Sequence, residues 1–201
     1  TFGQKEESVE AHFEKLDQMI SICQKLKTDK IRVFSFWREK DPSLYVDEIV
    51  AQLKKAAKVA EDAGVTLLLE NETACNGGYA SEVAEIVKHV DSPHLRALWD
   101  PGNEAHGGRS AFPEGYQAIK DYLGHVHLKD AYITDEGVPT CVPIGEGSVP
   151  YAEQIEQLEK DGYQGLFTIE THYIPEGGTA LDGTQLTLDG LHKTLSGTLK
   201  R

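Results

Sequence analysis

The chain has 201 residues, of which 39% are hydrophobic and 26% charged, so the sequence predicts a globular domain with a sizeable core. A formal net charge of −13 argues against nucleic acid as a main partner, because phosphate binding needs a basic surface. No apolar run approaches the roughly 18 residues of a membrane span, so we expect no membrane partner. Three scattered cysteines argue against a disulfide framework or a structural zinc site, and we expect a cytoplasmic protein.

Strand-like and helix-like segments alternate along the chain. IRVFSFW is rich in β-branched and aromatic residues, while VTLLLE and LRALWD are apolar runs that suit strands buried on both faces of a parallel sheet. Proline near the start and glycine just past the end mark the helix between the first two runs. In chain order we predict a helix at about 5–27, a strand at 31–37, a helix at 41–62, a strand at 65–70, a helix at 79–90, a strand at 95–100, a helix at 113–123, a strand at 124–130, a helix at 149–161, a strand at 165–170 and a helix at about 183–197.

The predicted strands begin about 30–40 residues apart, which is the repeat of βα units in a parallel α/β fold. No GxGxxG or GxxxxGK[ST] follows any of these strands, so a nucleotide-binding doubly wound sheet loses support. In a (β/α)8 barrel, which is another parallel α/β architecture, active sites form at the C-terminal rim of the strands. The polar residues at the strand ends therefore carry the functional information.

Four side chains that can bind metal fall at or near the C-terminal ends of successive predicted strands. They are Glu70, Asp100, His127 and Glu170. Three carboxylates and one imidazole suit Mn²⁺, Mg²⁺, Co²⁺ or Zn²⁺, with room for water or substrate oxygens. The alternative interpretation is that each side chain caps its strand or binds a loop amide.

The segments LLLEN, LWDPGN, HVHLKD and FTIETH resemble those of the xylose isomerase-like TIM barrels, the sugar phosphate isomerase/epimerase family, in consistent order from about residue 31 to 175. The resemblance implies that Glu70, Asp100, His127 and Glu170 bind a divalent metal. It also implies that Glu70 and Glu170 are the catalytic acid/base groups on opposite faces of the substrate.

The resemblance implies an isomerase or epimerase that acts on a sugar or sugar derivative. A proton would leave the carbon next to a carbonyl, and the metal would stabilise the resulting enediolate. A dehydratase of a cyclic polyol ketone or of a dehydroshikimate type starts with the same proton abstraction, so the sequence leaves a lyase open. A third interpretation is a non-catalytic truncated subunit that needs a partner.

The sequence departs from the family pattern at several positions. Family epimerases that act on free ketoses often carry a second glutamate soon after the first ligand, where this chain has Cys75. They and the AP endonuclease branch usually carry histidine three residues after the aspartate ligand, where this chain has Asn103. The AP endonuclease branch also has an Asp-x-His pair that segment 138–145 lacks, and this argues against DNA repair.

The predicted fold is a (β/α)8 TIM-barrel type that is incomplete. A closed barrel has eight strands and typically about 250 residues, whereas we predict strands that match the family's strands four to eight. We therefore expect the first three βα units to be missing from residues 1–201, which form a single partial domain. An open sheet exposes its edge, so we expect a homo-oligomer or another association that covers the missing strands.

Six further residues are candidates for substrate contacts. They are Trp37, Asn103, His125, Lys129, Glu146 and His172. His125 and Lys129 share a face with the histidine ligand by strand alternation. Glu146 belongs to a GEG turn whose amides could hold an oxyanion. The plainer alternatives are a solvated lysine at the rim, a glycine-rich loop and a core tryptophan.

The segment HVHLKD also predicts which acidic residue does not belong to the site. Asp130 should face away from His127 and Lys129 by strand alternation. We therefore expect its carboxylate to anchor the following loop. His106, in NEAHGG, is expected to be a solvated loop histidine, and Trp99 is expected to lie in the core.

Overall fold

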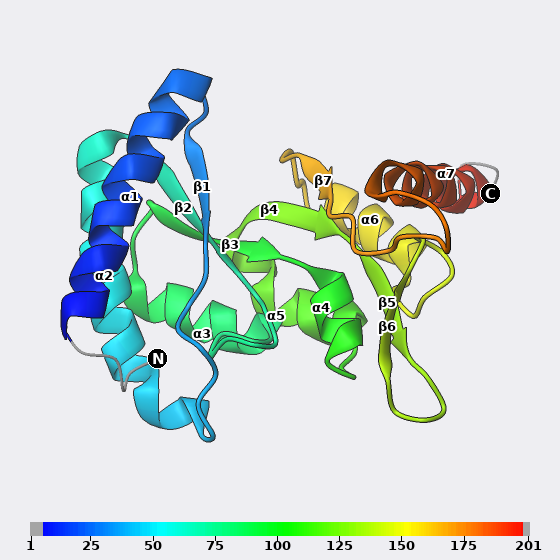
Figure 1. Ribbon diagram of the computed structural model, residues 1–201, viewed down its shortest axis with the longest axis horizontal. Helices are drawn as coiled ribbons and strands as arrows, with labels where there is room; N and C mark the ends of the chain where they lie inside the picture. Colours follow the sequence, from blue (N-terminus) through cyan, green and yellow to red (C-terminus); the bar gives the residue numbers. More distant parts are fainter. Residues whose placement is uncertain (1–5, 199–201) are drawn as a thin grey trace. The chain divides into compact units, whose positions relative to one another are not determined.

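The computed structural model describes residues 6–198 and divides into two compact units. The first unit runs to Leu98 and includes Tyr122–Gly124, and the second comprises Trp99–Asp121 and the chain from His125 onward. Figure 1 shows the elements along the chain. No helix among the described residues is long and apolar enough to cross a membrane.

The first unit is built from parallel strands and the helices that connect them. Its elements are α1 (Glu6–Leu26), β1 (Lys30–Val33), a 3-10 turn (Pro42–Tyr45), α2 (Val46–Ala63), β2 (Thr66–Glu70), α3 (Ala80–Val90) and β3 (Leu95–Trp99). β1 pairs with β2 and β2 with β3, both in parallel. α1 packs on α2 and β1, and α2 also packs on β2 and α3 (Figure 1).

Helix α2 shows why this sequence folds as it does. Its buried residues recur every three or four positions, at Ile49, Leu53, Ala57 and Ala60, which places them on one face of the helix. The helix ends at Gly64, whose φ of 68° is a left-handed conformation that glycine adopts without strain. The chain can therefore reverse directly into β2.

The second unit continues the sheet and adds a hairpin. Its elements are α4 (Pro101–His106), a turn (Ala111–Gly115), α5 (Tyr116–Ile119), a 3-10 turn (Lys120–Tyr122), β4 (Leu123–Leu128), β5 (Asp130–Ile133), β6 (Pro139–Val142), α6 (Tyr151–Lys160), β7 (Phe167–Ile169) and α7 (Ala180–Thr198). β4 starts in the first unit, where the Arg96 guanidinium donates to the Leu123 carbonyl at 3.4 Å, and runs on to pair in parallel with β7. The strand order β1-β2-β3-β4-β7 gives a five-stranded half-barrel sheet, which is TIM-barrel-like.

The five strands predicted from the sequence are present, but several boundaries were wrong. β1 ends at Val33, so Trp37 lies beyond the strand and forms an isolated bridge with Cys75. The helix predicted from Asp41 begins as a 3-10 turn and becomes α-helical only at Val46. The helix predicted at 113–123 is broken into two turns around the short α5.

Two elements were not predicted at all. Helix α4 has only six residues, which is too short to show a helical period, although Asp100 and Pro101 give the same start signal that we recognised at Asp41 and Pro42. The hairpin of β5 and β6 turns at Gly137, where φ is 79°. Both elements follow directly after strands that carry candidate ligands, so they shape the surroundings of the site.

The β1 side of the first unit is open. β1 is at the end of the strand order, and the unit has an apolar cavity of 640 Å³ lined by α1, α2, β1 and the segment after β1. Phe34 and Trp37, which line it, are 41% and 60% exposed. An open edge of this kind agrees with a partial barrel. The assignment of the five strands as the family's strands four to eight stays a prediction. The association that would cover the open edge also stays a prediction.

Candidate metal centre

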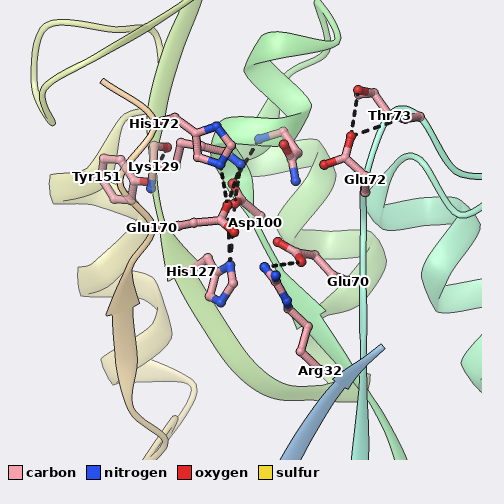
Figure 2. A network of polar contacts seen from close by, with 12 residues as sticks. Arg32, Glu70, Glu72, Thr73, Asp100, His127, Lys129, Tyr151, Glu170 and His172 are labelled. Carbon is pink, nitrogen blue, oxygen red and sulfur yellow. Dashed lines mark hydrogen bonds and ion pairs between the residues drawn. The ribbon is translucent and has the colours of Figure 1, made fainter. Parts of the chain in front are cut away.

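Three of the four predicted ligands come together in the second unit. Asp100, His127 and Glu170 each offer one ligand atom, and these atoms lie within 4.8 Å of one another. His127 Nδ1 is 3.7 Å from Asp100 Oδ2 and 3.8 Å from Glu170 Oε2 (Figure 2). These separations are too long for hydrogen bonds. Donors that share a metal at about 2.1 Å stand roughly 3–4 Å apart, so the donor set fits a divalent cation in spacing and in chemistry.

The local fold fixes the aspartate. Asp100 follows β3 and caps α4, where its Oδ1 accepts the Asn103 N–H at 3.0 Å. Aspartate is among the preferred N-cap residues because its carboxylate satisfies an otherwise unpaired helix N–H, and Pro101 suits the first helical position. One carboxylate oxygen is therefore occupied by the backbone, and the other points toward His127 and Lys129.

The histidine and the glutamate come from neighbouring strands. His127 is paired with Thr168 in the register of β4 and β7, and Glu170 follows two residues later. The Glu170 N–H continues the ladder by donating to the Leu128 carbonyl at 3.1 Å. The parallel register thus brings both side chains to the same end of the two strands.

A buried lysine neutralises two of the ligands. Lys129 Nζ lies 3.0 Å from Asp100 Oδ2 and 2.8 Å from Glu170 Oε2, and the lysine side chain is only 4% exposed. Burial works to lower the pKa of Lys129, but the charges of Asp100 and Glu170 raise it above its usual value. Burial works to raise the pKa of Glu170, but the hydrogen bond and charge of Lys129 lower it to about 2. The group is therefore a carboxylate–ammonium–carboxylate bridge at neutral pH.

The backbone of this lysine is held as tightly as its side chain. The Tyr151 hydroxyl accepts the Lys129 N–H at 2.8 Å and donates to the Lys129 carbonyl at 2.7 Å. Gly102 packs so closely that a Cβ there would lie 2.2 Å from the Lys129 carbonyl oxygen. Any larger residue at position 102 would displace the chain that carries Lys129.

The fourth predicted ligand ends β2 in the first unit. Glu70 is 1% exposed, and its Oε2 accepts from the Arg32 guanidinium at 3.2 Å (Figure 2). In the parallel register Glu70 lies opposite Leu98, and Asp100 follows Leu98 by two residues along the chain.

The predicted substrate-contact residues differ in where they lie. The His172 Nε2 is 3.2 Å from Glu170 Oε2, and the His125 Nε2 is 2.8 Å from the Thr168 hydroxyl, with its ring edge-on to that of His127. Asn103 is buried on α4. Lys129 is buried in the ion-pair bridge, so the alternative of a solvated lysine at the rim was wrong. The substrate-binding role of each residue stays a prediction.

The GEG turn does not offer its amides to a ligand. The N–H groups of Gly145, Gly147 and Val149 donate to the Asp130 carboxylate at 2.9–3.1 Å. Asp130 therefore anchors this loop, as strand alternation predicted, and the suggested oxyanion-binding turn was wrong because its donors are occupied. Glu146 is an exposed side chain on this anchored loop.

The other residues considered from the sequence have simpler positions. Trp99 is fully buried and its ring lies 5.5 Å from that of Tyr116, so it belongs to the core as predicted. His106 ends α4 and is half-buried, so it is not a solvated loop residue. Cys75, where family epimerases carry a glutamate, is buried, and burial raises the pKa of its thiol to about 11.

Sequence reasoning missed two residues that organise the site. The sequence signal for Arg32 was a basic residue inside a predicted strand, because the register that pairs Arg32 with Leu68, on the face of Glu70, is seen only in the structure. Tyr151 offered no comparable signal, because it lies on α6, 22 residues beyond the lysine that it holds.

Comparison with known proteins agrees with this architecture. Residues 2–191 match the model of the protein family described as "Xylose isomerase-like TIM barrel". An uncharacterized protein of Methanocaldococcus jannaschii is 35% identical over 140 residues, which cover 66% of this chain and 47% of that protein. D-psicose 3-epimerase of Enterocloster bolteae is 26% identical over 133 residues, covering 65% of this chain and 41% of the enzyme. The chain thus spans less than half the length of these two relatives.

Several solved structures share the fold at low sequence identity. The IOLI protein with a zinc atom superposes with a TM-score of 0.79 at 19% identity, covering 98% of this chain and 73% of that one. A probable 3-DHS dehydratase, AsbF of Bacillus anthracis, gives 0.74 at 21% identity, covering 91% and 70%. A xylose isomerase-like protein of Mycobacterium smegmatis in complex with magnesium gives 0.71 at 18% identity, covering 95% and 70%.

Proposed function

This chain belongs to the xylose isomerase-like TIM barrel family, and on that premise we propose that it is the metal-binding part of a sugar isomerase or epimerase. The observation that carries the proposal is the cluster of Asp100, His127 and Glu170, whose ligand atoms lie within 4.8 Å of one another at the ends of β3, β4 and β7. Its relative from Enterocloster bolteae is D-psicose 3-epimerase, which supports a sugar or sugar derivative as the substrate.

We assign Glu70 as the fourth ligand. Its support is the parallel register, in which Glu70 lies opposite Leu98 while Asp100 follows two residues after Leu98. Three carboxylates and one imidazole would accept Mn²⁺, Mg²⁺, Co²⁺ or Zn²⁺. Two solved structures of the same fold hold zinc or magnesium, which agrees with a divalent ion of this kind.

The bound metal would supply Lewis acidity to the hydroxyl and carbonyl oxygens of a sugar. The protein's own residues would move the proton. Glu170 would accept it, because this carboxylate is ionised at neutral pH and keeps 22% of its side chain exposed to a substrate. Glu70, on the other side of the ligand set in strand order, would return a proton to the opposite face of the same carbon. Lys129 would balance the charges of Asp100 and Glu170 before the proton moves.

A dehydratase is the second candidate, and one observation favours it. Cys75 stands where family epimerases for free ketoses often carry a second glutamate, and its buried thiol has a pKa of about 11, so it cannot replace an ionised carboxylate. A dehydratase would use the same proton abstraction and then expel a β-hydroxyl. The two activities differ in product, because only the dehydratase forms an alkene and releases water.

The test combines metal analysis with proton exchange in the full-length protein. We expect one divalent ion per chain, and deuterium uptake from D2O at the carbon next to the carbonyl of D-psicose or a related ketose. Glu170→Gln should lose both metal and exchange, whereas Glu159→Gln, an exposed glutamate on α6, should keep both. Stoichiometric metal without exchange in any ketose or cyclic ketone would contradict the enzyme proposal and favour the non-catalytic subunit. Unchanged metal and turnover in Glu170→Gln would contradict the site.

A further inference from the structure

The Lys129 ammonium contacts the same two carboxylate oxygens that face the histidine of the proposed metal centre. Asp100 Oδ2 lies 3.7 Å from His127 Nδ1 and 3.0 Å from Lys129 Nζ. Glu170 Oε2 lies 3.8 Å from His127 Nδ1 and 2.8 Å from Lys129 Nζ (Figure 2). A divalent ion bound by these side chains would therefore share both oxygens with a cation that the protein itself supplies.

The lysine has little freedom to leave these oxygens. Its side chain is only 4% exposed, so the ammonium has little access to water. His172 also lies 3.2 Å from Glu170 Oε2, but 48% of its side chain is exposed, so it can turn toward solvent. A buried ammonium that loses its carboxylate partners is strongly destabilising. We therefore expect Lys129 to stay beside both carboxylates when a divalent ion is bound.

A single tyrosine holds the main chain of this lysine. The Tyr151 hydroxyl accepts the Lys129 N–H at 2.8 Å and donates to the Lys129 carbonyl at 2.7 Å, and Tyr151 is 1% exposed. A neighbouring strand would satisfy these groups inside a sheet, but the register of β4 with β7 ends at Leu128. The tyrosine hydroxyl thus takes the place of a strand partner, and it sets the point from which the lysine side chain extends.

An ammonium at this position has opposite effects on the metal-free and the metal-bound site. Without a metal, its positive charge keeps two neighbouring carboxylates from repelling each other. With a metal, the ammonium repels the divalent ion and draws on the same oxygens, which lowers their affinity for a second cation. A fixed lysine therefore stabilises the metal-free arrangement and weakens the binding of the ion.

We propose that Lys129, positioned by Tyr151, is an internal counter-cation that keeps the metal-free site assembled and limits its affinity for a divalent ion, so that the ion can exchange. The inference rests on the proposed function, because it takes Asp100, His127 and Glu170 as metal ligands. Tyr151 is a positioning residue in this arrangement, since among the described residues its hydroxyl bonds only to the Lys129 backbone.

The test measures the dissociation constant for Mn²⁺ by titration calorimetry on the full-length protein, stripped of metal, at neutral pH. Lys129→Met removes the repulsion and should bind Mn²⁺ at least about tenfold more tightly than the wild type, on the scale of changes to groups around metal ligands. Tyr151→Phe keeps the buried ring but releases the lysine backbone. It should tighten binding in the same direction, by at least about threefold.

A double variant separates positioning from a general effect on stability. If Tyr151 acts through Lys129, adding Tyr151→Phe to Lys129→Met should change the Mn²⁺ affinity by less than about twofold, because the effects of coupled residues do not add. Tyr116→Phe is the matched control, because Tyr116 is also 1% exposed and its hydroxyl donates to Asp161 Oδ2 at 2.8 Å in the same unit. It should keep the wild-type affinity.

Two results would overturn the inference while leaving the proposed function intact. One is unchanged or weaker Mn²⁺ binding in Lys129→Met, which decides the sign even if Tyr151→Phe does not fold. The other is an effect of Tyr151→Phe that is absent in the wild-type background or persists in the Lys129→Met background, since Tyr151 would then only support the fold. If neither the wild type nor Lys129→Met bound Mn²⁺, the proposed metal centre itself would be contradicted.

Discussion

Asp100 and Glu170 both contact the Lys129 ammonium, at 3.0 and 2.8 Å, yet Asp100 is fully buried while Glu170 keeps 22% of its side chain exposed. Asp100 caps a helix and accepts a backbone N–H. Glu170 follows the short β7 and, besides Lys129, is contacted by His172, which is itself half exposed. One carboxylate is thus fixed by the fold and the other by side-chain charges.

This difference suits two roles. A buried carboxylate that also caps a helix cannot move far, so Asp100 is suited to hold a metal rigidly. A partly exposed carboxylate held by side chains can reorient and exchange protons, which is what the proposed role of Glu170 requires. The comparison therefore predicts that Asp100 matters most for stability and Glu170 most for activity.

The largest effect on stability is expected from Asp100→Asn. The change leaves the buried Lys129 ammonium with a weaker set of partners, and breaking a buried ion pair typically costs 3–5 kcal/mol. We expect the free energy of unfolding of the metal-free protein to fall by about 3 kcal/mol in urea titrations. Asp135→Asn, at the exposed tip of the hairpin, should change it by less than about 0.5 kcal/mol. If Asp100→Asn lowered the free energy of unfolding by less than about 1 kcal/mol, the claim that Asp100 matters most for stability would be wrong.

Lys129→Met should produce the next largest loss of stability. This variant removes the cation that Asp100 and Glu170 share. Two carboxylates would then lie close together without an ammonium, and we expect a loss of about 2 kcal/mol in the metal-free protein. A divalent ion can take over the charge balance, so Mn²⁺ should raise the melting temperature of the variant more than that of the wild type. Lys160→Met removes only an exposed ion pair with Glu156 and serves as control. Equal Mn²⁺ effects in both proteins would argue that no metal binds beside Lys129.

Much of the fold could be predicted because buried strands have a clear sequence signal. β2 and β3 are buried on both faces and appear as continuous apolar runs, while α2 shows a helical period and a terminal glycine. The short α4 and the β5–β6 hairpin were missed, because six residues and four-residue strands are too short for a period to emerge. Strand ends are set by hydrogen-bonding neighbours, which explains why β1 stopped before Trp37.

The site could be predicted only from the type of each residue and its position in a strand. Terminal acids on successive strands indicated the candidate ligands, and alternation placed Asp130 away from them. Contacts between residues far apart in sequence could not be read. The sequence therefore left Lys129 undecided between site and solvent, although it is buried between two carboxylates. Nor did the sequence show that the amide N–H groups of the GEG turn donate to the Asp130 carboxylate.

Glu170→Gln should affect metal binding far more than stability. Loss of a partly exposed carboxylate should lower the free energy of unfolding of the metal-free protein by about 1 kcal/mol. Affinity for Mn²⁺ should fall at least about 100-fold, since even changes to groups around a ligand cost 10- to 100-fold. Calorimetric Mn²⁺ titration and urea unfolding of the same preparation measure both. If stability fell as much as in Asp100→Asn, the two carboxylates would be equivalent and the proposed division of roles would be wrong.

The smallest effect concerns the pH dependence of stability, and it isolates the charge on Glu170. The pKa of this group is lowered from 4.5 to about 2 in the folded protein, because the hydrogen bond and charge of Lys129 outweigh burial. A lowered pKa means that the ionised group stabilises the fold above pH 4.5, and that this contribution is lost as the pH falls from about 4.5 toward 2. The difference in unfolding free energy between the metal-free wild type and Glu170→Gln should therefore shrink across this window. Urea titrations at pH 6, 4 and 3 in the presence of a chelator measure it, with Glu159→Gln as the control that shows no such change. A difference that stays constant from pH 6 to 3 would mean that Glu170 contributes through packing, and the contrast with Asp100 would then rest on burial alone.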